Sequence, residues 1–147
     1  MAGPAGTLEA ALFYAIMPGD NALPLPFGAK VEFPSDGPST TSDITRNTQN
    51  EFLLVIPGTY RVSVQASVSE PAQLVIALNN VQRAYTVVGR ATGTSQITLT
   101  TLVTTTAANV SLSVQNPTGN SAFSLTTSAG GGQPVSATLL IELVKAS

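Results

Sequence analysis

The 147-residue sequence contains no cysteine and no histidine. Without cysteine, the chain has neither a disulfide framework nor a zinc site built from thiolates. Without histidine, it lacks the usual general base, the partner that activates a serine or cysteine nucleophile, and the commonest ligand of transition metals. These absences exclude enzymes that depend on those groups, and we expect that the chain is not an enzyme.

Charged residues are also scarce. Lys, Arg, Asp and Glu make up 10% of the chain, against about 25% in an average protein, and the formal net charge is −2. Six Lys and Arg residues spread over the chain cannot neutralise a track of phosphates, so we expect no nucleic-acid partner. From Ala91 to Ile141 there is no charged residue at all, and this Thr-, Ser-, Asn- and Gly-rich span is neutral enough to pack against itself.

Long apolar runs are absent as well. No run reaches the ~20 residues that a membrane-spanning helix needs, so we expect no membrane partner. The N-terminus lacks the basic start and the long apolar segment of a signal peptide. We interpret Met1 as an added residue at the start of a fragment, with any targeting segment upstream of it.

The eight acidic residues form no catalytic or metal-binding pattern. A carboxylate pair can hydrolyse a glycoside without histidine, but no motif places two of these residues together. Most lie in the turn-dense first half, without the Asp-x-Asp-x-Asp spacing of a calcium loop; they include Asp20, Glu32, Asp36, Asp43 and Glu51. We therefore expect solvated loop carboxylates, with no metal and no cofactor.

Three other motifs have a chemical interpretation and a simpler one. Gly130-Gly131-Gly132 lies between predicted strands, where no helix dipole can hold a phosphate, so we interpret it as a flexible hairpin tip. Asn109-Val110-Ser111 matches the N-glycosylation pattern, which has meaning only in a eukaryotic or viral protein. Arg83, Tyr85 and Arg90 form either a ligand-binding rim or an exposed strand pair with solubilising charge, and the second is favoured.

The chain is organised around the stretch from Phe52 to Val68. Two strand-like runs flank Pro57-Gly58, where proline removes a backbone donor and glycine relaxes the turn. In the second run, Tyr60 to Val68, apolar residues alternate with Arg, Ser and Gln, which is the period-2 pattern of a strand with one buried face. The stretch predicts a core strand pair of an antiparallel sheet.

Other runs predict further strands between turn signals. Asp36-Gly37-Pro38 opens a predicted polar loop that continues to Arg46, and Asn79-Asn80 predicts a tight hairpin. The last run is apolar on both faces near its end, which indicates a strand covered on both sides. The predicted strands are Leu8–Met17, Lys30–Phe33, Pro71–Asn79, Val81–Val88, Gln96–Thr106, Val110–Val114, Phe123–Leu125 and Val135–Val144.

About ten short strands without a convincing helix predict an all-β fold, an antiparallel jelly-roll β-sandwich. A lipocalin-like barrel is the alternative. A chain of 147 residues can bury roughly 68–70% of its unfolded surface, so one domain over residues 8–147 is expected. Residues 1–7, which include Gly3-Pro4-Ala5, are either the end of a collagen-like stalk or an added flexible tail.

Several of these stretches together resemble a known family. Behind a Gly-x-y end lie Ala11-Leu12-Phe13-Tyr14-Ala15, then Ile56-Pro57-Gly58-Thr59-Tyr60-Arg61-Val62-Ser63-Val64, then the apolar strand from Ala137 to Leu143. They resemble the C-terminal globular domain of BclA-like collagen-like glycoproteins of bacterial spores, with Pro57-Gly58-x-Tyr60 as the most specific local match. The resemblance in strand order covers the chain from Leu8 onward. That domain shares the jelly roll of tumour necrosis factor and of the complement globular heads.

The resemblance implies a homotrimer whose jelly rolls pack around an axis collinear with a collagen triple helix. It also implies an extracellular position in the exosporium, the outermost spore layer, at the distal tip of hair-like filaments. A globular trimer would supply the effective concentration that starts a three-chain collagen zipper. A closed three-fold ring needs an apolar, nearly uncharged contact surface, for which the span from Ala91 to Ile141 and the last strand are suited.

Two functions remain open at this point. The first is structural trimerisation and surface display on a spore. The alternative is a receptor- or glycan-binding head, such as an adhesin or a phage or viral fibre knob. In that alternative the contacts would come from the loops around Asp20, Asp36–Arg46 and Asn116–Asn120.

Overall fold

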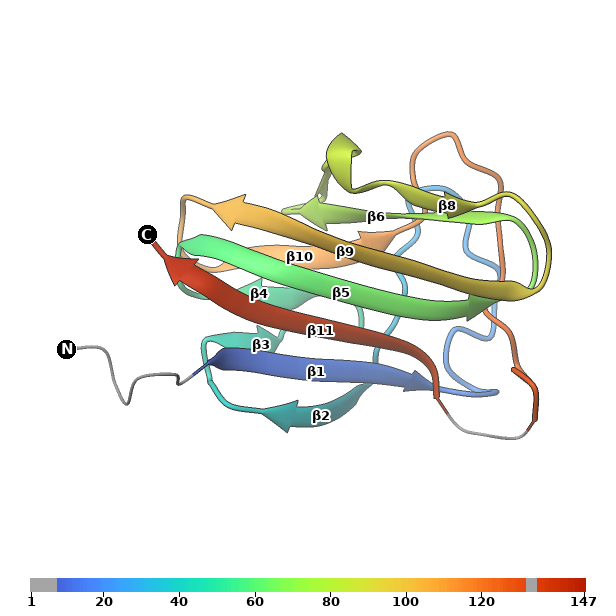
Figure 1. The fold of residues 1–147 in the computed structure, drawn as a ribbon, viewed down its shortest axis with the longest axis horizontal. Coiled ribbons are helices and arrows are strands. Elements are labelled where there is room, and N and C mark those ends of the chain that lie inside the picture. The colour runs from blue at the N-terminus through green and yellow to red at the C-terminus, as the bar shows by residue number, and fades with distance from the viewer. Residues whose placement is uncertain (1–7, 132–134) are drawn as a thin grey trace.

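The computed structural model describes residues 8–131 and 135–147, which form two antiparallel β-sheets packed face to face (Figure 1). The described residues include one short 3-10 helix, η1 (Ala84–Thr86), and none of them forms a helix long and apolar enough to cross a bilayer. The strands are β1 (Glu9–Ile16), β2 (Ser35–Ser39), β3 (Ile44–Arg46), β4 (Phe52–Leu54), β5 (Gly58–Val68), β6 (Ala72–Leu78), β7 (Val81–Gln82), β8 (Val88–Arg90), β9 (Ser95–Thr105), β10 (Val110–Gln115) and β11 (Val135–Ala146).

The strand order confirms the jelly-roll prediction. One sheet has five strands in the order β2-β1-β11-β5-β9. The other has six strands in the order β3-β4-β10-β6-β7, with β8 paired to β6. The lipocalin-like barrel is wrong, because the strands divide into two separate sheets whose inner faces share one hydrophobic core.

Strand β5 is a core strand, as predicted, and lies between β11 and β9 in the five-stranded sheet. Its apolar face, which includes Tyr60, Val62 and Val64, is at most 3% exposed. Val64 lies in register between Leu139 of β11 and Leu99 of β9, so it is enclosed within its own sheet as well as by the opposite one. The period-2 pattern therefore identified the buried face correctly.

The predicted strand pair within Phe52–Val68 is wrong. The run from Phe52 forms β4, which pairs with β3 and β10 in the six-stranded sheet, whereas β5 belongs to the five-stranded sheet. Pro57-Gly58 is thus a crossing between sheets and not a hairpin turn. The φ angle of Gly58 is not positive, and glycine is needed here because β11 approaches closely: an added Cβ would lie 3.0 Å from the Ala146 Cα and would collide with the Lys145 carbonyl oxygen.

An aromatic cluster closes one side of the core. The ring centroids of Phe13 and Phe52 are 4.4 Å apart, and Phe33 meets Phe52 edge-on at 6.1 Å. The guanidinium of Arg46 lies 5.3 Å from the centroids of both Phe13 and Phe52 and donates to the Asp36 carboxylate at 2.6 Å. Arg46 therefore covers the rings with a cation–π contact while its charge stays paired.

The chain around this cluster differs from the sequence-based prediction. Lys30–Phe33 forms no strand; it is an extended segment with one bridge, Lys30 to Gln115, and with Val31 and Phe33 fully buried. The predicted polar loop of Asp36–Arg46 instead contains β2 and β3. β2 pairs with β1 and β3 pairs with β4 through backbone hydrogen bonds, and such pairing does not require apolar side chains.

Some of the remaining strand predictions are confirmed and others are wrong. The strands predicted around β1, β6, β9, β10 and β11 are confirmed, as is the Asn79-Asn80 hairpin, whose φ angles are +49° and +64°. Val81–Val88 is not one strand, because η1 interrupts it. Phe123 and Leu125 are buried but form only isolated bridges, to Leu25 and to Val68.

The two ends of the sandwich have different roles in the chain. Strand β1 begins where β11 ends, since Glu9 is paired with Leu143, and we term this the terminal end (Figure 1). The loops that follow β1, β5, β8 and β10 lie at the opposite end, termed the distal end. The predicted stalk or tail at residues 1–7 and one residue of the predicted glycine hairpin tip, Gly132, lie outside the described residues.

Candidate functional site

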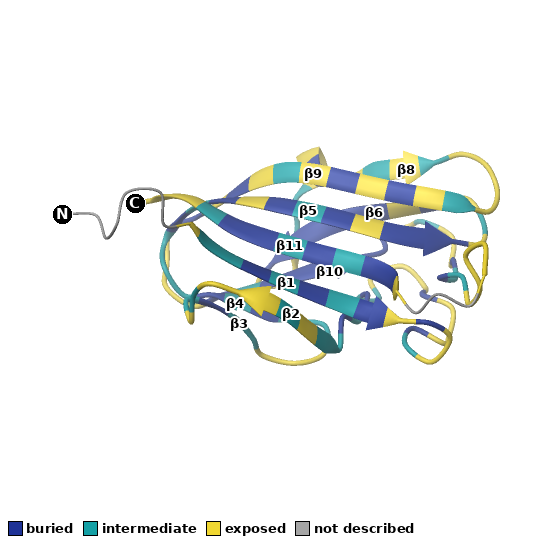
Figure 2. Cartoon of the chain, turned by 60° about the horizontal axis from the view of Figure 1, so that its bottom comes forward, coloured by how far each residue is buried: buried dark blue, intermediate teal, exposed yellow. Residues whose placement is uncertain are grey.

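The outward side of the five-stranded sheet, termed the front face, has very little charge. It consists of alternate residues of β1, β11, β5 and β9, and Figure 2 shows these alternating with buried residues along the strands. Register places Leu12 beside Leu140, and Tyr14 beside Thr138. In the body of the sheet the charged residues at these alternate positions are Arg61 and Glu142, and the others are aliphatic, Tyr, Thr, Ser or Gln. At the terminal end, a register shift in β11 places Lys145 opposite Thr59, on the same face.

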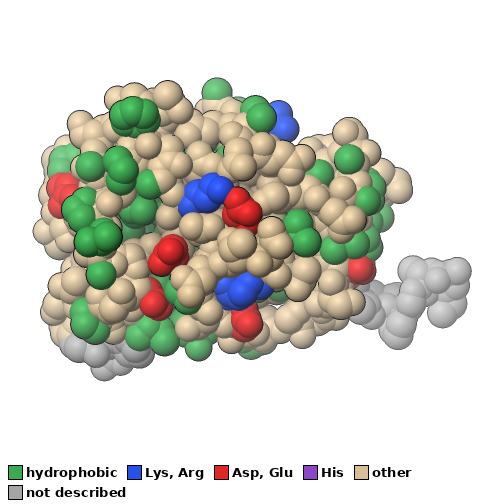
Figure 3. Space-filling view, turned by 180° about the vertical axis from the view of Figure 1, so that it is seen from behind, with side chains coloured by type: hydrophobic (Ala, Val, Ile, Leu, Met, Phe, Trp, Pro, Cys, Tyr) green, Lys and Arg blue, Asp and Glu red, His purple; other side chains and the backbone are tan. Residues whose placement is uncertain are grey.

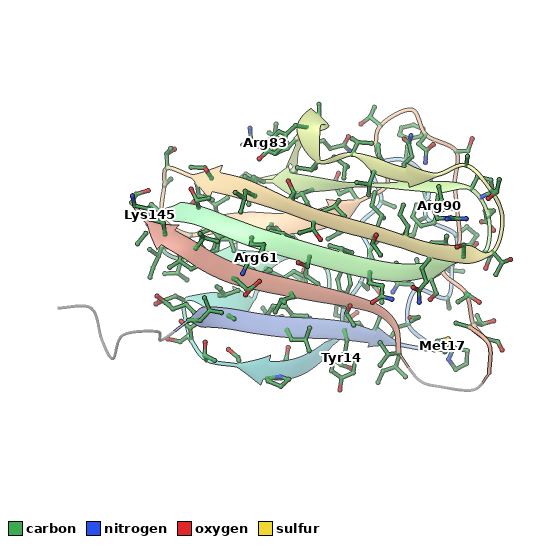
Figure 4. The ribbon with its side chains drawn as sticks, viewed as in Figure 1. Tyr14, Met17, Arg61, Arg83, Arg90 and Lys145 are labelled. Carbon is green, nitrogen blue, oxygen red and sulfur yellow. The ribbon has the colours of Figure 1, made fainter. Side chains whose placement is uncertain are left out.

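Arg61 and Glu142 neutralise each other in the middle of the front face (Figure 4). The Arg61 Nε and Nη2 groups donate to the two Glu142 carboxylate oxygens at 2.8 and 3.1 Å, a bidentate arrangement. The hydrogen bonds from Arg61 hold the pKa of Glu142 below its ordinary value, and the same contact raises the pKa of Arg61. The body of the front face therefore carries a charge pair but no net charge, and Lys145 adds a positive charge at its terminal end.

This pairing leads to a pH-dependent expectation. Because the folded pKa of Glu142 is lowered, its stabilising contribution is present above the unfolded pKa of about 4.3 and is lost as the pH falls through the folded pKa. Arg61 is half exposed, so solvent screening keeps the contribution small. In urea titrations at one fixed chain concentration, Glu142→Gln should be less stable than the wild type at pH 7, and the gap should narrow as the pH is lowered to 3. An equal gap at both pH values would contradict the assignment.

The β9 edge of the front face presents exposed apolar side chains. Tyr85, in η1, is 67% exposed, yet its hydroxyl donates to the carbonyl of Leu102 at 2.7 Å. Leu102, on β9, is 51% exposed. Thr86 fixes η1 in place, because its hydroxyl accepts from the Ile76 amide and donates to the Arg83 carbonyl, each at 2.8 Å. An anchored tyrosine therefore extends the front face beyond its last strand.

Arg83, Tyr85 and Arg90 do not form the single cluster that their sequence spacing suggested. Figure 4 shows Arg83 beside η1 and Arg90 near the distal end of the same edge, well apart. Arg90 donates only to the hydroxyl of neighbouring Thr92, at 3.3 Å, and the Nε atoms of both arginines have no partner among the described residues. The ligand-binding rim considered for these three residues is therefore not assembled.

The three loops of the alternative function are divided between the two ends. Asn116 holds the segment after Asp20 at the distal end, since its side chain donates to the Leu25 carbonyl at 2.8 Å and its own carbonyl accepts from the Gly28 amide at 2.7 Å. The Asp36–Arg46 segment turns at the terminal end, where Thr41 donates to the Glu9 carboxylate at 2.6 Å. Only the first and third loops can therefore act together.

The back of the molecule has a different distribution of charge, and Figure 3 shows several acidic and basic side chains near its middle. Lys30 pairs with Glu51, which precedes β4, and Arg46 of β3 pairs with Asp36 of β2, the edge strand of the other sheet. No group of three or more acidic side chains able to hold a metal ion occurs within residues 8–131 and 135–147. The two faces of the sandwich are thus chemically distinct.

Sequence inspection missed one feature of the distal end. The run Ala22-Leu23-Pro24-Leu25-Pro26-Phe27 was interpreted only as a turn-dense segment broken by prolines. In the structure Leu23 is 78% and Phe27 is 60% exposed, and the loop borders a cavity of about 330 Å³. Six consecutive apolar residues with two prolines were the available signal. Asn109, of the glycosylation motif, is an exposed turn residue with φ of +57° between β9 and β10.

Comparison with known proteins gives a fold and no sequence family. No family model and no curated protein matches the chain. Among solved structures, Eiger TNF from S. frugiperda aligns with a TM-score of 0.65 at 13% identity, over 96% of this chain and 95% of that one. The globular domain of the zebrafish complement 1qA protein aligns with a TM-score of 0.59 at 12% identity, over 95% and 99%. Murine APRIL aligns with a TM-score of 0.61 at 7% identity, over 93% and 99%.

The chain has the complement-1q/TNF-like jelly-roll fold. At these identities the likeness establishes architecture and does not transfer a ligand or a partner. The side chains of this jelly roll give it a nearly uncharged front face, an anchored apolar β9 edge, and an exposed apolar loop at the distal end.

Proposed function

We propose that the chain is a non-enzymatic structural head that assembles as a homotrimer. The observation that carries the proposal is the front face. The body of this four-stranded face carries only one charge pair, which is internally neutralised, and that is unusual on a surface that must remain in water. Covering it with a second copy would bury no unpaired charge, because Arg61 and Glu142 are already bound to each other in a bidentate pair.

A three-fold ring requires two different complementary surfaces on each copy, because its contacts are heterologous. The front face, with Leu12 and Leu140, would be one of them. The β9 edge, with Tyr85 and Leu102, lies at a side of the same sheet and would be the other. Successive copies joined in this way close a ring and leave both ends of the sandwich uncovered.

The finer proposal follows the sequence resemblance. In it, the head is BclA-like, caps a collagen-like stalk, and forms the tip of a glycoprotein filament in the spore exosporium. The jelly-roll fold and the position of Leu8 directly before β1 support this, since a stalk joined to the chain would enter at the terminal end. The distal end would then face outward, away from the spore.

Light scattering tests the trimer. The wild type should have three times the 15.0-kDa mass of the chain at micromolar concentration. Leu140→Arg places an unpaired charge at the centre of the front face, and we expect trimer dissociation to become at least about ten-fold more favourable while the sheet signal in circular dichroism persists. Leu23→Arg is the matched control at the distal end and should remain trimeric. A monomeric wild type would refute the proposal.

The spore assignment needs a separate test. Antibodies raised against the domain should label the tips of surface filaments on intact spores of the source organism. The coding sequence upstream of the head should contain sustained Gly-x-y triplets. A trimeric head that follows a fibre shaft without such triplets would keep the trimer and overturn the spore assignment in favour of a fibre knob.

A further inference from the structure

The loop Ala22–Phe27 displays apolar side chains at the distal end. All six of its residues are apolar, and Leu25 is the buried one, with 7% exposure. Leu23 and Phe27, on either side of it, point away from the core and are mostly exposed. Figure 3 shows hydrophobic side chains gathered at this end of the molecule. Exposed apolar groups of this size on a short loop are typical of contact sites.

The loop is held rigidly before any partner binds. The Leu25 amide donates to the Phe123 carbonyl at 2.7 Å, and the Phe123 amide donates back at 3.2 Å. The Ala29 amide donates to the Pro26 carbonyl at 3.0 Å, with Gly28 at φ of +79°, so Phe27 stands at the corner of a glycine-dependent turn. Leu23 and Phe27 are thus presented on a preorganised frame, which lowers the entropic cost of binding.

A cavity of about 330 Å³ lies beside this loop. Its walls include residues of the loop together with Lys30 and Glu32. Asn21 fixes this wall, since its side chain donates to the Glu32 carbonyl at 2.9 Å and accepts from the Glu32 amide at 2.7 Å. The volume is within the range of side-chain and small-ligand sites.

The charge of the cavity is unbalanced. The Lys30 ammonium is paired with Glu51. The Glu32 carboxylate is half-buried and has no hydrogen-bond or ion-pair partner among the described residues. A bound group with a positive charge would therefore be favoured next to Glu32.

We propose that the loop Ala22–Phe27 and the adjoining cavity form a docking site for a protein segment. The segment places a lysine or arginine side chain in the cavity against Glu32 and packs aliphatic or aromatic side chains on Leu23 and Phe27. Charge complementarity selects this occupant. An anionic membrane surface would be repelled by Glu32, and a second copy meeting this end symmetrically would bring the same carboxylate. The site is separate from the front face and does not depend on trimer formation.

A random peptide display library, panned on the wild-type protein, tests the site. Enriched peptides should share a Lys or Arg next to an aliphatic or aromatic residue. A peptide synthesised from the consensus should bind the Glu32→Gln protein at least about ten-fold more weakly than the wild type. The double variant Leu23→Ser, Phe27→Ser should lose affinity by a similar factor. Asp43→Asn removes a half-buried carboxylate at the terminal end and Val81→Ser removes an exposed apolar residue elsewhere, and both should bind as the wild type does.

Three results would overturn the inference. The first is enrichment of peptides without a cation, or binding that is unchanged in Glu32→Gln. The second is sedimentation with anionic vesicles that is lost in the Leu23→Ser, Phe27→Ser protein. The third is association of heads through the distal end that is lost in the same protein. Light scattering on each sample reports the trimer separately, so failure of the docking site and failure of the trimer are distinguishable.

Discussion

Val64→Asp is expected to leave the chain unfolded. Val64 is 3% exposed and is flanked in register by Leu99 and Leu139, so no rotamer of an aspartate at this position reaches water. The substitution removes apolar burial and inserts a carboxylate without a partner, and such a buried charge costs several kcal/mol. That cost is a large part of the ~5–15 kcal/mol by which a domain of this size is stable.

Two variants separate the charge from other effects. Val64→Ala removes methyl groups only and should lower the free energy of unfolding by about 2 kcal/mol. Gln65→Asp introduces the same carboxylate one residue later, on the front face, and should keep the sheet signal of the folded chain even where it weakens the proposed trimer. Circular dichroism and urea titration measure all three. An unchanged melting temperature for Val64→Asp would mean that the buried face of β5 has been assigned incorrectly.

Gly58→Ala is expected to destabilise the domain by about 1–3 kcal/mol. The added methyl group would meet the backbone of β11 at Lys145 and Ala146, and backbone cannot rotate aside as a side chain can. Gly58 is also fixed on its other side, because its amide donates to the buried Thr105 hydroxyl at 3.2 Å. Either β11 must separate from β5 here or the start of β5 must move.

Gly93→Ala is the matched control. An added Cβ at Gly93 has no heavy atom within 4 Å, and its φ is not positive. The same substitution there should change the free energy of unfolding by less than about 0.5 kcal/mol. If Gly58→Ala and Gly93→Ala unfold at the same urea concentration, the close approach of β5 and β11 is not the reason that position 58 needs glycine.

The fold could be predicted from the sequence wherever a strand has one buried face. β5 and β9 alternate clearly because their inner residues must fill the core while their outer residues stay in contact with water. β2 and β3 could not be found in this way. They are short edge strands held by backbone hydrogen bonds, and sequence such as Ser35-Asp36-Gly37-Pro38-Ser39 carries no apolar alternation.

The strands that were predicted but do not form have a related cause. Val31, Phe33, Phe123 and Leu125 are buried, so they produce the apolar signal of a strand, but their segments make only isolated backbone bridges. Apolar alternation reports burial and does not report pairing. Val81–Val88 does not form one strand because η1 interrupts it. The Thr86 hydroxyl in η1 accepts the hydrogen bond from the Ile76 amide that the backbone of a neighbouring strand would otherwise accept.

The candidate surfaces were predictable only in part. The scarcity of charge from Ala91 to Ile141 was visible in the sequence, but β10 within that span lies in the six-stranded sheet and not on the front face. The neutral pair of Arg61 and Glu142 joins residues far apart in the chain and depends on the β5–β11 register. The exposure of Leu23 and Phe27 depends on Leu25 being anchored by Phe123 and Asn116, which no local pattern shows.

The position of β1 has a mechanical consequence. It starts at the terminal end, runs toward the distal end, and is hydrogen-bonded along its length to β11 on one side and to β2 on the other. A pulling force between a tether before Leu8 and a partner held at the distal end would act parallel to β1. Such a force loads its hydrogen bonds in shear, all at once, and does not open them one after another. The domain is therefore expected to resist extension along this axis far better than peeling across it.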